Sequence, residues 1–379
     1  MRTAYDAIVV GAGPAGSAAA TVLARASFQT LVLEKDTFPR RKVCGAFLAA
    51  GALASLEHLG AEENVALIGP ERIERGSVSL PSGPAVPFAL PAPGLGISRF
   101  ALDELLARGA RRAGAEVRFG ARVCGVESAN GGFRVLLSGG ERVDTGVVIG
   151  AWGRWDKLDR SLDRAFLGTR APYFGWSAEY AGDTAALAGE VRLYVFPGGY
   201  CGLSRVEGGR VNLAGVVSDT TRRAVGGGWE AVVSHASSSN AKLAADLSEL
   251  FPGPEGFLGT GPVFFTAKPP TENGLLMAGD AAGVLDPFSG EGQAAALASG
   301  ILAGETAVRR LRGSIAAAAL CRVYSDAWRD RFARPFAWSA LFRRFMLSPS
   351  LGALAGRLAG HSLARFAVRA LTAPSLPPA

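Results

Sequence analysis

Cysteine and histidine are scarce in this chain, and their scarcity excludes several kinds of site. The four cysteines lie far apart in the sequence: Cys44, Cys124, Cys201 and Cys321. None belongs to a C-x-x-C pair, so we expect neither a disulfide framework nor a metal site, and we predict a cytoplasmic location where thiols stay reduced. The three histidines stand outside any motif: His58, His235 and His361. We therefore expect them to be surface or core residues rather than catalysts.

Long apolar runs are also missing. No run reaches the ~20 residues that a membrane-spanning helix needs. The N-terminus enters a β-like run directly, which leaves no room for a signal peptide. The net charge is +7, mostly from arginine, but no basic stretch is interleaved with aromatic residues, so a nucleic-acid partner is not predicted. The positive charge suits a phosphate-bearing cofactor or an anionic membrane surface.

The stretch from 5 to 34 has the most informative pattern. Residues 5–10 form a β-branched run that predicts a buried strand, and G-A-G-P-A-G follows at 11–16. Residues 17–26 are rich in helix-forming Ala and Leu, and a second strand ends on Glu34. A lone G-x-G-x-x-G can be an ordinary glycine-rich turn. Strand, glycines, helix, strand and acid within about thirty residues are typical of a dinucleotide-binding unit.

Each part of this unit has a physical role. Gly11 allows a tight turn out of the strand, Gly13 lets a pyrophosphate approach the backbone, and Gly16 lets the helix lie close to the sheet. The helix N-terminus offers unpaired N–H groups and a partial positive charge to the phosphates. Glu34 is placed to accept hydrogen bonds from ribose hydroxyls and disfavours a 2′-phosphate. The unit therefore predicts FAD or NAD rather than NADP.

Residues after Glu34 alternate between predicted helices and strands, and at 379 residues the chain is long enough for two or more domains. Helices are expected at 46–59, 100–113, 229–250, 290–302 and from 311 onward. Strands are expected at 77–90, 117–126, 133–137, 143–149, 192–202, 210–217 and 274–280. The proline-rich tail at 373–379 is expected to be disordered.

These elements resemble the FAD-binding scaffold of the p-hydroxybenzoate hydroxylase superfamily, and within it the geranylgeranyl reductase branch. The sequence K-V-C-G at 42–45 resembles the K-x-C-G element of that branch. G-D-A-A-G-V-L-D-P-F-S-G-E-G at 279–292 is similar to its most specific signature. Y-V-F-P at 194–197 stands where the branch has W-x-F-P. Flavin-dependent halogenases have W-x-W-x-I-P there, and Arg192 and Tyr194 replace both tryptophans, which argues against a halogenase.

One segment departs from the superfamily. Its third FAD element usually reads G-A-D-G-x-x-S-x-x-R, whereas residues 150–159 read G-A-W-G-R-W-D-K-L-D. Trp152 replaces the aspartate that helps to hold FAD and orient NADPH, and Asp156 and Asp159 replace the serine and arginine. Because the other two FAD segments are intact, we expect FAD binding to survive, with a changed approach for the nicotinamide.

The resemblance implies an α/β fold: a Rossmann-like FAD-binding domain with an inserted antiparallel β-sheet substrate domain and a helical C-terminus. The FAD-binding domain is expected to be discontinuous, over 1–70, 96–170 and 265–310. The substrate domain would comprise 71–95 and 171–264. The C-terminal helical region with its tail would cover 311–379.

The resemblance also implies roles for single residues around a non-covalent FAD. Asp280 would accept a hydrogen bond from the ribityl chain, and Arg99 would reach the pyrophosphate. Gly290, Gly292 and the N–H of Gln293 would face the flavin N1–C2=O edge, which becomes anionic on reduction. The full expected set is Gly11, Gly13, Pro14, Ala15, Gly16, Glu34, Lys35, Arg41, Lys42, Val43, Cys44, Arg99, Val123, Gly279, Asp280, Pro287, Gly290, Gly292 and Gln293.

The substrate is expected between the flavin and the inserted β-sheet. Candidate pocket walls are aromatic, although core packing is the ordinary role of such residues: Trp176, Tyr194, Phe196 and Tyr200. The sequence identifies no catalytic residue. Acid–base work, if the reaction needs it, would fall to a tyrosine or a cysteine: Tyr194, Tyr200 or Cys44. Cys201 is better explained as a buried core cysteine.

Three functions fit the sequence. The first is an NADPH- or NADH-using monooxygenase that hydroxylates an apolar aromatic or polyketide-type substrate. The second is a flavin-dependent reductase of isoprenoid or lipid double bonds, and the third is a non-catalytic flavin-binding protein. A small apolar organic substrate is expected, and the basic C-terminal helices are a candidate surface for peripheral membrane contact. The oligomeric state is not predicted.

Overall fold

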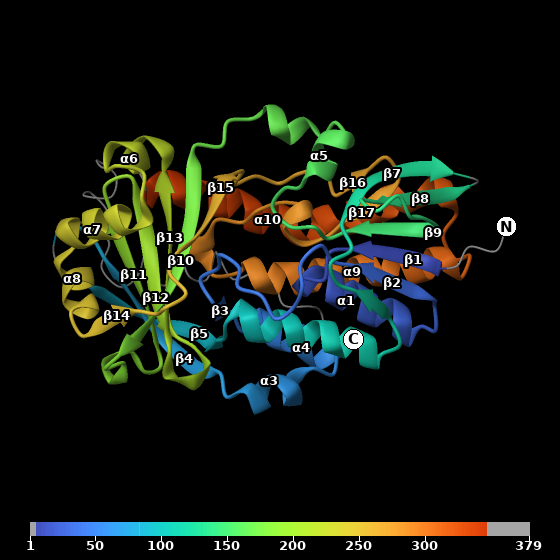
Figure 1. Cartoon of the computed structure of the whole chain (residues 1–379). Coiled ribbons are helices and arrows are strands. Elements are labelled where there is room, and N and C mark those ends of the chain that lie inside the picture. The colour runs from blue at the N-terminus through green and yellow to red at the C-terminus, as the bar shows by residue number, and fades with distance from the viewer. Residues whose placement is uncertain (1–4, 83, 130, 347–379) are drawn as a thin grey trace.

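Two β-sheets lie side by side in the computed structural model, which describes residues 5–346 except 83 and 130 (Figure 1). The first sheet has the order β16-β17-β9-β1-β2-β6, with the β7–β8 hairpin added to β9. Its strands are β1 (Tyr5–Val10), β2 (Thr30–Leu33), β6 (Glu116–Arg118), β7 (Val123–Ala129), β8 (Gly132–Leu137), β9 (Arg142–Gly150), β16 (Thr271–Glu272) and β17 (Leu275–Met277). Strands far apart in the sequence therefore share this sheet.

The centre of the first sheet is parallel and buried on both faces. Strand β1 pairs in parallel with β2 on one side and β9 on the other. All four residues of β2 are buried, as are the last four of β1. Strands covered on both faces are typically continuous apolar runs, as these are. Their carboxyl ends therefore meet at one edge of the sheet, where the glycine-rich turn begins.

Helices α1 (Pro14–Arg25), α4 (Arg99–Arg112) and α9 (Gly292–Leu311) lie against this sheet, and α2 (Gly51–His58) and α3 (Glu62–Ile68) follow alongside (Figure 1). Helix α1 touches α9 very closely. A Cβ atom at Gly300 would lie 2.2 Å from the carbonyl oxygen of Ala15, and one at Gly304 would lie 2.9 Å from the Cβ of Val22. The two glycines therefore set the distance between these helices.

The second sheet has the order β14-β10-β13-β12-β11-β4-β5-β3, with β15 paired to β10. Its strands are β3 (Phe47–Leu48), β4 (Glu71–Ser79), β5 (Val86–Gly96), β10 (Tyr173–Gly182), β11 (Glu190–Phe196), β12 (Gly199–Arg205), β13 (Val211–Ser218), β14 (Leu250–Pro252) and β15 (Leu258–Val263). Helices α6 (Asp219–Ala224), α7 (Trp229–Ser239) and α8 (Ala241–Leu247) lie at its outer side (Figure 1). Its other face looks toward the first sheet.

The structure differs from the sequence-based expectations in several places. The strand predicted at 117–126 is two strands, β6 and β7, and the one predicted at 192–202 is the β11–β12 hairpin. The inserted sheet is mixed rather than antiparallel, because β11 pairs with β4 in parallel. The helix predicted at 46–59 begins only at Gly51, since β3 pairs with β5 first. The helix predicted at 229–250 is two helices, because the Asn240 side chain accepts a hydrogen bond from the Leu243 N–H and starts α8 anew.

The C-terminal region contains helix α10 (Leu320–Met346), which runs behind both sheets (Figure 1). Trp328 and Phe332 are buried against the first sheet's core, and the Tyr324 hydroxyl donates to the carbonyl of Met277 at 2.6 Å. The helical C-terminus is thus confirmed as far as 346. The rest of the predicted region, with His361 and the predicted disordered tail, lies outside the described residues.

The close α1–α9 contact gives a stability prediction. We expect Gly300→Ala to lower the free energy of unfolding by about 1–3 kcal/mol, because the added methyl group would overlap the Ala15 carbonyl. The matched control is Gly109→Ala in α4, where a Cβ meets nothing within 4 Å. That change should raise stability by about 0.4–1 kcal/mol. Denaturant unfolding of both variants measures the difference, and equal effects would contradict the role of Gly300.

Candidate active site

A single cavity of about 730 Å³ lies between the two sheets. One end is lined by the glycine-rich turn and the start of α1, and the other by the inner face of the second sheet. The loop between β17 and α9 joins the two ends. Segments that are distant in the sequence therefore meet at one site.

The glycines of the first motif have distinct surroundings. Gly11 has a φ of +104°, and a Cβ there would lie 2.4 Å from the Ala151 carbonyl oxygen. A Cβ at Gly16 would lie 1.8 Å from the Gly11 carbonyl oxygen, so this glycine serves helix packing and does not line the cavity. A Cβ at Gly13, the N-cap of α1, would approach only the Arg99 guanidinium, at 3.5 Å. Gly13 thus leaves open space between a helix N-terminus and a cation.

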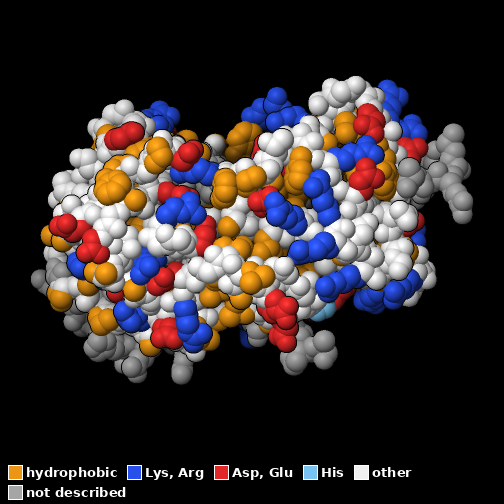
Figure 2. Space-filling view, turned by 60° about the horizontal axis from the view of Figure 1, so that its bottom comes forward, with side chains coloured by type: hydrophobic (Ala, Val, Ile, Leu, Met, Phe, Trp, Pro, Cys, Tyr) orange, Lys and Arg blue, Asp and Glu red, His pale blue; other side chains and the backbone are white. Residues whose placement is uncertain are grey.

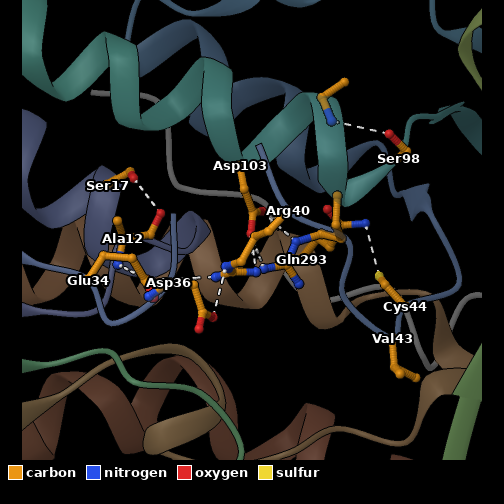
Figure 3. Close-up of polar contacts among 12 residues, drawn as sticks. Ala12, Ser17, Glu34, Asp36, Arg40, Val43, Cys44, Ser98, Asp103 and Gln293 are labelled. Atoms are coloured by element: carbon orange, nitrogen blue, oxygen red, sulfur yellow. Dashed lines mark hydrogen bonds and ion pairs between the residues drawn. The ribbon is translucent and has the colours of Figure 1, made fainter. Parts of the chain in front are cut away.

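Three cations surround that open space. Arg99 donates to both carboxylate oxygens of Asp103, and Arg40 lies 3.2 Å from the same carboxylate (Figure 3). Burial, together with Arg40 and Arg99, lowers the pKa of Lys42 to about 8. Arg40 also lies 3.3 Å from the Asp36 carboxylate and 3.7 Å from that of Glu34. The three cations converge beside the N-terminus of α1, and this arrangement favours a bound anion.

Glu34 lies at the rim of the same cluster (Figure 3). Its Oε2 accepts from the N–H of Ala12 at 2.8 Å, and its Oε1 accepts from the N–H of Asp36 at 3.0 Å. These backbone donors hold the carboxylate at the cavity wall, where it can also accept hydroxyl hydrogens. The neighbouring Lys35 is paired with Asp156.

The loop before α9 forms the middle of the cavity. Asp280 faces Arg154 at 3.5 Å, and Lys268 donates to the Asp280 carbonyl at 2.8 Å. The Gln293 side chain donates to the Phe47 carbonyl at 3.2 Å and points toward the Cys44 sulfur at 3.5 Å (Figure 3). Its Oε1 has no partner among the described residues. The start of α9 therefore presents free polar groups to the cavity.

Most residues predicted to bind the cofactor line this one cavity: Gly11, Gly13, Pro14, Ala15, Glu34, Lys35, Lys42, Val43, Cys44, Arg99, Val123, Gly279, Asp280, Pro287, Gly290, Gly292 and Gln293. Gly16 and Arg41 do not. The Arg41 guanidinium instead donates to the carbonyls of Glu255 and Gly256 in the second sheet's loop. Arg41 therefore does not line the cavity where we expected it to contact the cofactor, whereas the neighbouring Arg40 does.

Side-chain alternation divides the predicted substrate wall. Val191 and Leu193 of β11 line the cavity, so Tyr194 and Phe196 point to the opposite face, under α7 and α8. The Tyr194 hydroxyl donates to Asp246 at 2.6 Å, and burial raises the Tyr194 pKa. The prediction that Tyr194 and Phe196 line the substrate pocket is therefore wrong, because both belong to the core on the other side of the sheet. For the same reason Tyr194 is no longer a catalytic candidate.

Tyr200, Trp176 and Cys44 do line the cavity. The Tyr200 hydroxyl donates to Asp286 at 2.5 Å and accepts from the Phe288 N–H at 3.1 Å, so its hydrogen is already engaged. Trp176 is fully buried and belongs mainly to the core behind the sheet. Cys201 is also in that core, and burial raises its pKa.

Residues 150–159, which depart from the superfamily pattern, take part in a buried hydrogen-bond network around Trp152. The indole N–H donates to both carboxylate oxygens of Asp159 at 3.2 Å. Arg164, which is fully buried, donates to Asp159 at 3.0 Å and to the Ala281 carbonyl at 2.8 Å. The network thus ties the third FAD segment to the loop that carries Asp280. The indole itself lines the cavity and packs against Gly150.

Sequence reasoning missed several lining residues. Arg154 and Glu291 line the cavity, but neither residue has a sequence signal of its own within its motif. Arg40 also lines it, and only the direction of its side chain distinguishes it from Arg41. Strand β5 contributes Phe88, Leu90 and two neighbours to the wall. Its signal was present, because 86–96 reads V-P-F-A-L-P-A-P-G-L-G without a polar side chain.

The residues present fit FAD. The open space over Gly13, the N-terminus of α1 and the cations beside it suit a pyrophosphate. Among the described residues, no group of three or more His, Cys, Asp and Glu side chains could hold a metal ion. All four cysteines are free thiols.

Comparisons with known proteins agree with this geometry. The sequence profile of the family described as "FAD binding domain" matches residues 4–187. Digeranylgeranylglycerophospholipid reductase 1 of Methanopyrus kandleri is 31% identical over 359 residues, which cover 88% of this chain and 88% of the relative. Menaquinone reductase of Mycobacterium tuberculosis is 28% identical over 400 residues, covering 97% of this chain and 90% of that protein.

Solved structures show the same fold. A geranylgeranyl bacteriochlorophyll reductase-like protein from Thermoplasma acidophilum has a TM-score of 0.79 at 20% identity, covering 98% of this chain and 96% of that one. A flavin-dependent brominase has a TM-score of 0.82 at 19% identity, covering 98% and 94%.

The surroundings of Gly13 give a test of the phosphate site. We expect Gly13→Val to abolish FAD binding, because the branched side chain would occupy the space over the helix N-terminus. The fold should survive, since only the Arg99 guanidinium lies within 4 Å of the added Cβ. Circular dichroism and flavin absorbance of the purified variant measure both. A folded variant with unchanged flavin affinity would exclude this loop as the phosphate site.

The Trp152 network gives a second test. Trp152→Asp would place a second carboxylate beside Asp159, so we expect it to weaken FAD binding and to bring no faster flavin reduction by NADPH. Trp152→Phe is the matched control, because it keeps a ring and removes only the N–H donor. The FAD dissociation constant and the stopped-flow reduction rate decide. Faster reduction with unaltered binding in Trp152→Asp would instead mark a missing nicotinamide-orienting aspartate.

Proposed function

The chain belongs to the geranylgeranyl reductase branch of the p-hydroxybenzoate hydroxylase superfamily, and from that premise we propose that it reduces carbon–carbon double bonds in a polyprenyl or similar lipid chain. It is an FAD-dependent oxidoreductase and an enzyme, which sets aside a non-catalytic flavin-binding role. The reduction is the second of the functions that the sequence allows, and the curated relatives named above favour it over hydroxylation.

The apolar inner face of the second sheet is the observation that carries this proposal. Side chains that face the cavity from β4, β5, β11 and β13 are hydrocarbon: Val78, Phe88, Leu90, Val191, Leu193 and Val216. Strand β12, which lies between β11 and β13, adds Tyr200 and Ser204. Gly175 and Gly202 lie on the same face, and because they have no side chains they leave space in the cavity. A long hydrocarbon chain buries apolar area against such a wall without leaving polar groups unpaired.

The cofactor would be held by the groups described above. The α1 N-terminus with Arg40, Lys42 and Arg99 would bind the pyrophosphate, and Glu34 would bind the ribose. Asp280 would bind the ribityl chain, and the start of α9 would face the flavin ring. When bound, the flavin supplies hydride chemistry. NADPH or NADH is the proposed electron donor, and Trp152 leaves its approach different from that of the superfamily.

Lipid substrates would bring the protein to a membrane surface, and we propose peripheral contact. No helix among the described residues is long and apolar enough to cross a bilayer. Helix α10 is rich in arginine and exposes Leu341, which is 59% accessible. On the face drawn in Figure 2, hydrophobic side chains gather in the middle with Lys and Arg beside them. Such combinations suit an anionic bilayer surface.

Anaerobic re-oxidation separates reduction from hydroxylation. We expect protein with dithionite-reduced flavin to be re-oxidised by geranylgeraniol in detergent micelles without O₂, and the alcohol should gain one hydrogen at each carbon of a reduced double bond. Mass spectrometry of the product and flavin absorbance measure the reaction. Re-oxidation that needs O₂, with an oxygen atom added to the alcohol, would contradict the proposal and support the monooxygenase.

A further inference from the structure

Reduction of a carbon–carbon double bond consumes a proton as well as a hydride. An isolated double bond in an apolar pocket has no water beside it to supply that proton. The protein must therefore place an acid at the cavity wall, and the acid must hold its proton near neutral pH. The sequence suggested only tyrosine and cysteine for this work.

The carboxylates of the cavity differ in their partners. Five line it: Glu34, Asp36, Asp156, Asp280 and Glu291. The first accepts backbone N–H groups, and the next three each face a cation. Glu291 is the exception, because its Oε2 has no hydrogen-bond partner within the described part of the chain. Its side chain takes part in no ion pair there either.

Glu291 is the N-cap of α9, the helix whose start is expected to face the flavin ring. It precedes Gly292, the first residue of α9, and its N–H donates to the Ser289 hydroxyl at 3.3 Å. The Phe47 ring lies against the adjacent Gly290. The residue is only 4% exposed. An unpaired carboxyl group is therefore buried where the flavin ring and the apolar wall are expected to meet.

The earlier candidates are less suited to this step. The Tyr200 hydrogen is engaged by Asp286, and Tyr194 lies behind the sheet. The Cys44 sulfur accepts from the Gln293 amide, and this contact leaves the thiol hydrogen free, so Cys44 is the alternative donor that the tests of Glu291 must separate. The buried Asp286 is bonded to Tyr200 and lies 3.6 Å from Arg343, and it does not line the cavity. Glu291 remains as the carboxyl that is both free and at the wall.

We propose that Glu291 is the proton donor of the double-bond reduction, an inference that rests on the proposed function. The reduced flavin delivers a hydride to one carbon, and the π electron pair takes the proton from the Glu291 carboxyl group at the other. Two C–H bonds would form, and three bonds would break: the π bond, the flavin N–H bond that supplies the hydride, and the O–H bond of Glu291. The flavin ends oxidised and Glu291 ends as a carboxylate, which regains its proton from water.

The electrostatics of the site support this role. Burial alone raises the pKa of Glu291 to about 8, and no charged side chain in the described residues contributes to that shift. The carboxyl group is therefore mostly protonated at pH 7, and it loses the proton as the pH rises through about 8. A group protonated at neutral pH suits an acid and does not suit the base that phenol hydroxylation would need.

The first test does not depend on turnover. Glu291→Gln removes the acid and keeps the shape, and Glu305→Gln is the matched control on the exposed side of α9. Wild-type protein with bound FAD should show an infrared band of a protonated carboxyl group that disappears as the pH rises through about 8. Subtracting the spectrum of Glu291→Gln isolates this band from that of Asp286, whose pKa is also raised by burial. No band in the difference spectrum would overturn the proposal.

The second test is a single turnover without O₂. Glu291→Gln should bind FAD and accept electrons from dithionite like the wild type, while re-oxidation by geranylgeraniol slows by about 10²-fold or more. Glu305→Gln should match the wild type in both steps. Equal re-oxidation rates in Glu291→Gln and the wild type would overturn the role of Glu291. A wild type that no polyprenyl alcohol re-oxidises would instead overturn the proposed function, and the infrared titration would still decide whether Glu291 holds a proton.

Discussion

Helix α1 lies so close to β1 and α9 that backbone meets backbone, and this contact positions the rest of the site. Glycines at 11 and 16 allow the turn to fold under the helix, and glycines at 300 and 304 allow α9 to approach from the other side. Any side chain there would push the helix N-terminus away from the cavity. The anion-binding end of the site is therefore a consequence of packing rather than of charge alone.

The charged side chains beside the N-terminus of α1 add to the anion-binding geometry that this packing sets. Arg40 and Arg99 share the fully buried Asp103, which holds both guanidinium groups in place but neutralises only part of their charge. Lys42 stands among them, and burial, followed by the charges of Arg40 and Arg99, lowers its pKa. A pyrophosphate would relieve the repulsion between these cations, so the bound cofactor and the fold stabilise each other.

Side chains alternate between the two faces of the second sheet, so one face packs in a core and the other lines the cavity. Its outer face carries aromatic side chains into a core under α7 and α8, and its inner face turns small and aliphatic side chains toward the cavity. Because the loop before α9 closes this cavity, Glu291 lies between an apolar wall and the cofactor end. A carboxyl group in such a place keeps its proton, since little nearby stabilises the charged form.

The sequence by itself determined the dinucleotide-binding unit, because glycines, helix formers and the acid act through local backbone geometry. Its resemblance to a known family supplied most of the other residues that line the cavity. Only the tertiary structure decided which side chains face the cavity. Strand register sends Tyr194 away and brings Leu193 in. Arg40 and Arg41 are adjacent in sequence, yet Arg40 points into the cation cluster while Arg41 crosses to the second sheet. The isolation of Glu291 likewise depends on what lies around it in space, and no local pattern in the sequence records the absence of a partner.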